Sequence, residues 1–173
     1  HPTLVPMNNI LSQVDDVMNA VLVKGQRFGT SMFYGHGAGG DATASAIISN
    51  LVEAINFSEN IDTTNTLISS RVGTLNKKIK NIDQVESSFY LRIHAKDIPG
   101  VMAEITNILA KEKISIEAVT QHEPEQNTSS IPIVMITNSV AGLSINKAID
   151  KIQDLKNIDG KVNKIRVLKL NEK

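Results

Sequence analysis

Two hydrophobic periodicities alternate along the second half of the chain, and their order restricts the fold more than any other feature. Apolar residues at every second position predict half-buried strands, whereas apolar residues at helical spacing predict amphipathic helices. The pattern predicts elements at residues 89–95 (strand), 100–112 (helix), 114–120 (strand), 131–137 (strand), 145–155 (helix) and 161–170 (strand). This βαββαβ order is typical of the ferredoxin-like fold, in which two helices cover one face of a four-stranded antiparallel sheet.

Polar residues add two expectations to this half. Ser144 precedes the second helical pattern and is predicted to cap that helix, because a hydroxyl can accept a hydrogen bond from a free N–H group. Tyr90, Arg92 and His94 alternate with the apolar residues of the first strand. They are predicted to lie on the sheet face away from the helices, which must be solvated or covered by a partner.

A glycine-rich loop dominates the first half of the chain. The pattern predicts, in order, a strand at residues 19–24, a hairpin loop at 25–29, a strand at 30–34, the glycine loop at 35–40 and a helix at 44–56. Asp41 or Thr43 is placed to cap this helix. Because glycine lets the backbone approach a bound group and a helix N-terminus attracts anions, the loop is a candidate ligand-binding element.

Gly35, Gly37 and Gly40 fit the letters of the dinucleotide fingerprint GxGxxG. That motif needs a parallel strand–loop–helix–strand unit, with an acidic residue about 20 positions further on at a strand end. Here the preceding strand belongs to a predicted hairpin, and Glu59 and Asp62 fall in a polar stretch. The loop is therefore not expected to be the primary pyrophosphate cradle, and a turn needed only for tight strand–helix packing is the structural alternative.

Composition excludes several classes of function. A formal net charge of +0 and 3% aromatic residues argue against nucleic acid and anionic membranes as partners. The absence of cysteine rules out disulfides and thiolate chemistry, and no apolar run reaches the roughly 20 residues of a membrane span. The four histidines lack metal-ligand spacing, so no metal site is predicted. We expect a cytoplasmic protein, and the His1-Pro2 start suggests a fragment.

The first half contains four short runs: His1-Pro2-Thr3-Leu4-Val5-Pro6, Asn19-Ala20-Val21, Gly35-His36-Gly37-Ala38-Gly39-Gly40 and Thr43-Ala44-Ser45. In this order they resemble the end of the catalytic region of homoserine dehydrogenase. The resemblance implies that the glycine loop folds back onto a nucleotide-binding domain near the nicotinamide end of NADP or NAD. By position it assigns Gly39 and Thr43 as cofactor-proximal residues, with Gly37 and Ala38 beside them.

The same resemblance implies that the main catalytic elements lie upstream of His1. The family's dinucleotide fingerprint, catalytic lysine and aspartate, and homoserine-binding acids have no counterparts in this sequence. No catalytic residue is therefore assigned, and the chain alone is expected to be inactive and not to bind the cofactor. The choice between NAD and NADP cannot be read, because the residue that contacts the ribose is not present.

The second half resembles an ACT domain, a regulatory module that binds amino acids. The resemblance lies in Leu91-Arg92-Ile93, Asp97-Ile98-Pro99-Gly100-Val101, Ile105, Leu109 and Ile114-Ser115-Ile116. It implies an effector site at Asp97, Gly100, Val101 and Ser115, usually across a domain–domain interface. A helix N-terminus at Gly100 can bind a carboxylate, and Asp97 can bind an ammonium group. The structural alternative is that Asp97 caps the helix and Gly100 only permits the turn.

Together the patterns predict an α+β chain with three parts. Residues 1–70 form a hairpin–glycine loop–helix segment of a dehydrogenase catalytic region, residues 71–86 are a linker, and residues 87–173 are a ferredoxin-like ACT domain. The resemblance implies the C-terminal part of an NAD(P)-dependent homoserine dehydrogenase, with threonine as feedback effector and homo-oligomerisation through the ACT domain. The alternative is a non-catalytic ACT module for amino-acid binding or oligomerisation.

Overall fold

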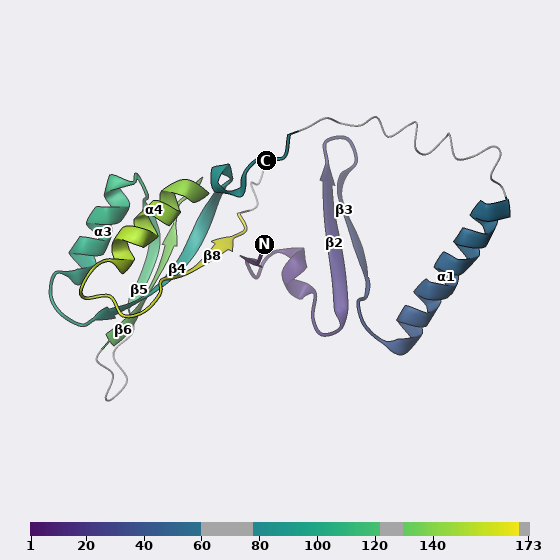
Figure 1. Ribbon diagram of the computed structural model, residues 1–173, viewed down its shortest axis with the longest axis horizontal. Coiled ribbons are helices and arrows are strands. Elements are labelled where there is room, and N and C mark those ends of the chain that lie inside the picture. The colour runs from purple at the N-terminus through teal and green to yellow at the C-terminus, as the bar shows by residue number, and fades with distance from the viewer. Residues whose placement is uncertain (60–77, 122–129, 170–173) are drawn as a thin grey trace. The chain divides into compact units, whose positions relative to one another are not determined.

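The computed structural model describes residues 1–59, 78–121 and 130–169 (Figure 1). The chain divides into two compact units. The C-terminal unit contains His1–Pro6 together with Ile79–Lys173, and the hairpin unit contains Met7–Lys78. The predicted boundary at residue 70 lies outside the described residues, whereas the grouping of His1–Pro6 with the C-terminal unit was not foreseen from the sequence.

The C-terminal unit has the predicted βαββαβ order. Its elements are β4 (Glu86–Lys96), α3 (Val101–Lys111), β5 (Ile116–Gln121), β6 (Ser130–Thr137), α4 (Gly142–Gln153) and β8 (Asn163–Val167). The four long strands lie in the order β8-β4-β6-β5, and each neighbouring pair is antiparallel. This arrangement confirms the α+β class and the ferredoxin-like topology of this half.

Two short strands enlarge the predicted four-stranded sheet. β1 (Thr3–Leu4) pairs in parallel with β8, and β7 (Val140–Ala141) pairs with the start of β4. The sequence predicted a sheet of four strands, whereas the sheet has six among the described residues. Pro2 and Pro6 keep the β1 segment extended, and its edge position tolerates their missing N–H groups. Nothing in the sequence pattern of β1 indicates which strand it joins.

The core of the C-terminal unit lies between its sheet and its two helices, which cover one sheet face (Figure 1). Phe89, Leu91, Ile93 and Ala95 are fully buried on that face, as their alternation predicts. From the helices, the buried residues are Val101, Ile105, Leu109, Ile145, Ala148, Ile149 and Ile152. On the open face, Tyr90 and His94 are half-buried and Arg92 is exposed.

Two capping predictions were wrong. Helix α4 begins at Gly142 with Ala141 as its N-cap, so Ser144 lies inside the helix. β7 leads directly into this helix, which therefore starts earlier than its apolar stripe indicates. Helix α1 (Gly40–Glu59) also begins early, and this places Asp41 and Thr43 in its first turn rather than before it.

The hairpin unit contains η1 (Ile10–Gln13), β2 (Met18–Gly25), β3 (Gly29–His36) and helix α1. β2 and β3 pair from Met18↔His36 to Gly25↔Gly29, which confirms the predicted hairpin and its loop. The apolar stripe of α1 is exposed: the side chains of Ile48 and Leu51 are 61% and 59% accessible. All the buried apolar residues in the described part of the chain belong to the C-terminal unit.

Candidate functional site

A cavity of about 290 Å³ opens where β4 turns into α3. Its walls come from the end of β4, the turn, the first residues of α3, the end of β5 and the start of β6. The lining residues are Lys96, Asp97, Ile98, Pro99, Gly100, Val101, Met102, Gln121, Ile131 and Ile133. Three of the four predicted effector residues, Asp97, Gly100 and Val101, therefore lie around one cavity.

The shape of the turn follows from a few backbone conformations. The N–H of Ile98 donates to the carbonyl oxygen of Lys96 at 2.9 Å, which closes a tight bend after the strand. Gly100 is the N-cap of α3 and has a φ of 99°, in the left-handed region that favours glycine. No side chain caps this helix, so Asp97 does not cap it and that alternative interpretation was wrong. The interpretation of Gly100 as a turn residue is confirmed.

The cavity combines an apolar floor with exposed polar residues. Val101, Ile131 and Ile133 are at least 97% buried and supply the floor. The exposed polar residues Lys96, Asp97 and Gln121 also line the cavity, beside the N-terminus of α3, which no side chain caps. A helix N-terminus and a lysine attract a carboxylate, and an aspartate attracts an ammonium group. This arrangement has the chemistry to hold a small zwitterion with a short, largely apolar side chain.

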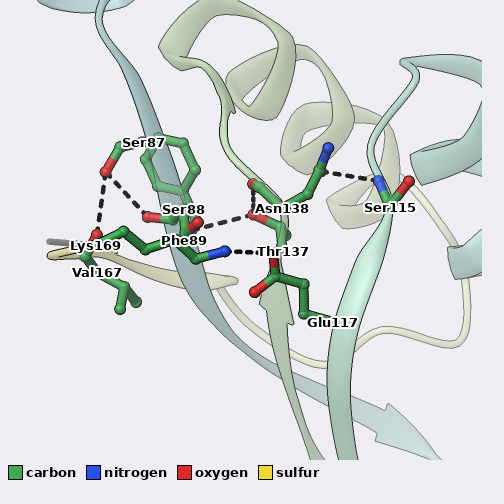
Figure 2. Close-up of polar contacts among 9 residues, drawn as sticks. All are labelled: Ser87, Ser88, Phe89, Ser115, Glu117, Thr137, Asn138, Val167 and Lys169. Atoms are coloured by element: carbon green, nitrogen blue, oxygen red, sulfur yellow. Dashed lines mark hydrogen bonds and ion pairs between the residues drawn. The ribbon is translucent and has the colours of Figure 1, made fainter. Parts of the chain in front are cut away.

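Ser115, the fourth predicted effector residue, is not part of this cavity. It pairs with Asn138 (Figure 2): its N–H donates to the Asn138 Oδ1 atom at 3.0 Å, and its carbonyl oxygen accepts from the Asn138 N–H at 2.9 Å. Strand register explains the separation. Gln121 pairs with Ile133 near the cavity, while the start of β5 pairs with Thr137 at the other end of β6. A role for Ser115 across an interface stays a prediction.

The lining residues that were not predicted as site residues from the sequence are Lys96, Ile98, Pro99, Met102, Gln121, Ile131 and Ile133. Met102 follows Val101 in the first turn of α3, so its position was readable from the helix start. Gln121, Ile131 and Ile133 come from strands far along the chain, and only the pairing of β4, β6 and β5 brings them to the turn. The strand order of a ferredoxin-like sheet is the one signal that could have indicated them.

The glycine loop between β3 and α1 has a defined backbone. The Gly37 N–H donates to the Val17 carbonyl oxygen at 2.8 Å, and Gly39 has a φ of 125°. A Cβ at Gly37 would come within 2.0 Å of the Asn19 amide, so a larger residue here would displace the Asn19 side chain. Thr43 donates from its hydroxyl to the Gly39 carbonyl oxygen at 2.9 Å. The structure thus keeps the predicted cofactor residues Gly37, Ala38, Gly39 and Thr43 together at one exposed helix start.

A second, more open hollow lies on the hairpin itself. It measures about 240 Å³ and is lined by Asn19, Ala20, Val21, Phe33, Tyr34, Gly35 and His36. None of the four predicted cofactor residues lines it. Within residues 1–59, 78–121 and 130–169 there is no cluster of potential metal ligands, and no helix there has the length and hydropathy of a membrane span.

Family models match the two halves separately. Residues 1–52 match the homoserine dehydrogenase family, and residues 89–157 match the ACT domain family. The first match contains the hairpin, the glycine loop and the start of α1, and the second contains the cavity. The two resemblances seen in the sequence are thereby confirmed.

Similar proteins match nearly the whole chain. The homoserine dehydrogenase of Pseudomonas aeruginosa is 37% identical over 99% of the chain, and that of Neisseria gonorrhoeae is 35% identical over 99%. The chain spans only 40% of the length of each. The crystal structure of a homoserine dehydrogenase from Thiobacillus denitrificans is 35% identical, with a TM-score of 0.76 over 97% of this chain and 38% of that one. By sequence and fold, the chain is therefore similar to the C-terminal part of homoserine dehydrogenases, with a segment that matches that family followed by a segment that matches the ACT domain.

Proposed function

We propose that this chain is the regulatory C-terminal part of an NAD(P)-dependent homoserine dehydrogenase and binds an amino-acid effector in the cavity at the β4–α3 turn. The parent enzyme would interconvert L-homoserine and L-aspartate 4-semialdehyde in threonine and methionine synthesis. The observation that carries the proposal is the cavity, because Asp97, Gly100 and Val101 were assigned as effector residues by resemblance and all line it. Threonine is the first candidate effector.

The cavity suits an α-amino acid for specific chemical reasons. The α3 N-terminus and Lys96 would bind the carboxylate, and Asp97 would bind the ammonium group. The side chain of the ligand would then lie over Val101 and Ile131, with the Gln121 amide as a neutral hydrogen-bonding group in the lining. A side chain with one methyl and one hydroxyl group, as in threonine, matches that combination.

Titration calorimetry with threonine tests the effector site. We expect measurable heat at millimolar threonine with the unmodified chain and at least about tenfold weaker binding with Asp97→Ala, because an ion pair to the ligand is lost. Asp154→Ala is the matched control, since Asp154 is an exposed carboxylate at the C-terminal end of α4. No heat from the unmodified chain, or equal weakening by both variants, would count against the site.

The glycine loop is proposed as the late, returning part of the cofactor site in the parent enzyme. Gly37, Ala38, Gly39 and Thr43 would lie near the nicotinamide end of NADP or NAD, with the remaining contacts supplied by the part of the family fold outside this chain. The exposed helix start and the left-handed Gly39 support a close approach to a ligand. We expect the chain alone to oxidise no homoserine with either cofactor, and measurable turnover would contradict this.

Self-association through the ACT domain is part of the proposal. The sheet face away from the helices carries half-buried apolar side chains from three strands, among them Tyr90, Ile136 and Ile165. A second copy of the chain would cover this face, as ACT domains often oligomerise. Light scattering at high protein concentration should give a dimer or larger species, and a monomer would refute this part. A purely non-catalytic sensor, the alternative function, is disfavoured by the family match of residues 1–52.

A further inference from the structure

The chain passes between its two units twice, after Pro6 and before Ile79. In the C-terminal unit, the segment before the first passage and the segment after the second passage both contact the same strand, β8. β1, which precedes the first passage, pairs with β8 through Thr3↔Arg166 and Leu4↔Val167, and the Leu168 N–H donates to the Leu4 carbonyl oxygen at 2.9 Å. The turn η2 (Ile82–Gln84), which follows the second passage, also contacts β8.

Arg166 in β8 is the residue common to both attachments. Its backbone lies in register with Thr3 of β1 on one side and Phe89 of β4 on the other. Its guanidinium donates to two carbonyl oxygens around η2, that of Ile82 at 3.1 Å and that of Val85 at 3.4 Å. The guanidinium carbon lies 5.0 Å from the centre of the buried Phe89 ring, which fixes the side chain by a cation–π contact.

Further contacts hold η2 in place. Asn146 of α4 donates to the Asp83 carboxylate at 3.2 Å and accepts from the Lys164 ammonium of β8. The Gly142 N–H donates to the Val85 carbonyl oxygen at 3.2 Å, and a Cβ at Gly142 would lie 3.0 Å from the Asp83 Cα atom. The turn is therefore packed against the start of α4 as well as bonded to β8.

We propose that β8, through Arg166, couples the two connections of the hairpin unit, so that loosening one connection loosens the other. The Arg166 guanidinium contacts two carbonyl oxygens around η2 and the Phe89 ring, and its backbone is in register with Thr3 of β1. Both connections are therefore attached to the same strand. A shift of β8 would then act on both ends of the hairpin unit at once. The proposal goes beyond the effector site and does not depend on any ligand.

Amide hydrogen exchange on the full chain tests the coupling. In Arg166→Ala we expect the amides of residues 81–85 and of Leu168 to exchange at least about tenfold faster, because the two hydrogen bonds from the charged guanidinium to η2 are lost and the loosening passes through β8 to the β1 pair. Arg166→Lys keeps the charge but lacks the two-pronged donor, and it should give a smaller acceleration. The amide of Ile93, at the centre of β4, should change by less than about threefold and reports whether the unit stays folded.

Lys151→Ala is the matched control. It removes a cation that is ion-paired with Glu112 between α3 and α4 and that makes no hydrogen bond or ion pair to β1, β8 or η2 among the described residues. It should leave residues 81–85 and Leu168 unchanged. The same acceleration in this variant as in Arg166→Ala would show a general loss of stability and would overturn the proposal.

The reciprocal variant lacks residues 1–5 and therefore lacks β1. If the connections are coupled, the amides of residues 81–85 should exchange at least about threefold faster, although within the described part of the chain the deleted residues make no hydrogen bond to η2. Unchanged exchange at residues 81–85 in this deletion variant would overturn the coupling. Faster exchange in Arg166→Ala at residues 81–85 but not at Leu168 would overturn it too, because the two connections would then be attached independently.

Discussion

Gly100 lines the cavity at the β4–α3 turn in a left-handed conformation, with a φ of 99° and open space around its missing Cβ. Gly100→Ala should therefore act through backbone strain alone and lower the free energy of unfolding by about 1–2 kcal/mol. Gly160→Ala is the control, because Gly160 has a φ of 72° and equally open space but lies outside the cavity.

Urea unfolding of the two variants should give similar losses of stability, whereas only Gly100→Ala should also weaken threonine binding. A Gly100→Ala chain as stable as the unmodified one would contradict the strain at this turn.

Thr137 carries a buried hydroxyl that joins two strands (Figure 2). Its Oγ1 atom accepts from the Phe89 N–H at 3.1 Å and donates to the Asn138 carbonyl oxygen at 2.9 Å. Thr137→Val keeps the shape but leaves the Phe89 N–H without an acceptor, so it should destabilise the C-terminal unit by about 1–3 kcal/mol. Thermal unfolding measures this, with the exposed Thr120→Val as control. Equal stability of the two variants would show that water replaces the bond.

The sequence predicted residues of the site only where they lie close together along the chain. Asp97, Gly100 and Val101 follow one another around a turn, so the pattern of that turn was enough to indicate them. Gln121 and Ile131 reach the same cavity through strand pairing, and no local pattern describes that. The capping role offered for Asp97 failed because the left-handed Gly100 lets α3 start without a side-chain cap.

At the scale of elements, α3 and α4 are joined by an ion pair. Lys151 donates to the Glu112 carboxylate, and this hydrogen bond holds the pKa of Glu112 below its ordinary value of 4.5. A carboxyl with a lowered pKa in the folded state stabilises the protein above its unfolded pKa, and the contribution disappears as the pH falls through the folded value. The ion pair should therefore contribute fully at neutral pH and be lost in acid.

Glu112→Gln should lower the melting temperature slightly at pH 7, and the difference from the unmodified chain should vanish as the pH falls through the lowered pKa of Glu112, because the carboxyl then becomes protonated. Thermal unfolding between pH 3 and pH 7 measures the difference. Glu104→Gln on the same helix is the control, because no ion pair to Glu104 occurs among the described residues. A difference that grew toward low pH would have the wrong sign for this pair.

Elements were predictable where apolar periodicity extends over a full strand or helix. β4 and α3 agree with their patterns because each buries one continuous face, whereas β1 and β7 have two residues each and no periodicity to detect. Each short strand forms because it pairs with a longer one, β1 with β8 and β7 with β4. The early start of α4 has the same origin, since β7 and the Gly142–Val85 hydrogen bond fix the helix start.

At the scale of the whole molecule, the two units differ in how they are stabilised. The C-terminal unit contains the buried core, while Ile48 and Leu51 of α1 are more than half exposed. The double variant Ile48→Gln with Leu51→Gln should therefore change the stability of the C-terminal unit by less than about 0.5 kcal/mol. Leu109→Ala, which removes a fully buried side chain, should lower it by about 2–5 kcal/mol.

Tyrosine fluorescence can separate the units, because the chain contains no tryptophan and two tyrosines, Tyr34 in the hairpin unit and Tyr90 in β4. In a Tyr34→Phe background the signal reports the C-terminal unit alone during urea unfolding. A large loss in the α1 variant would show that this helix supports the C-terminal unit.

The β1–β8 pair has a consequence for how the protein is made on the ribosome. Thr3 leaves the ribosome well before its partner Arg166, because residues 4–165 lie between them in the sequence. The outer edge of β8 can be covered only after both segments have left the ribosome, and a contact between such distant segments forms slowly. Until then the exposed edge can pair with other nascent chains, so slowing the translation of the last strand should increase misassembly.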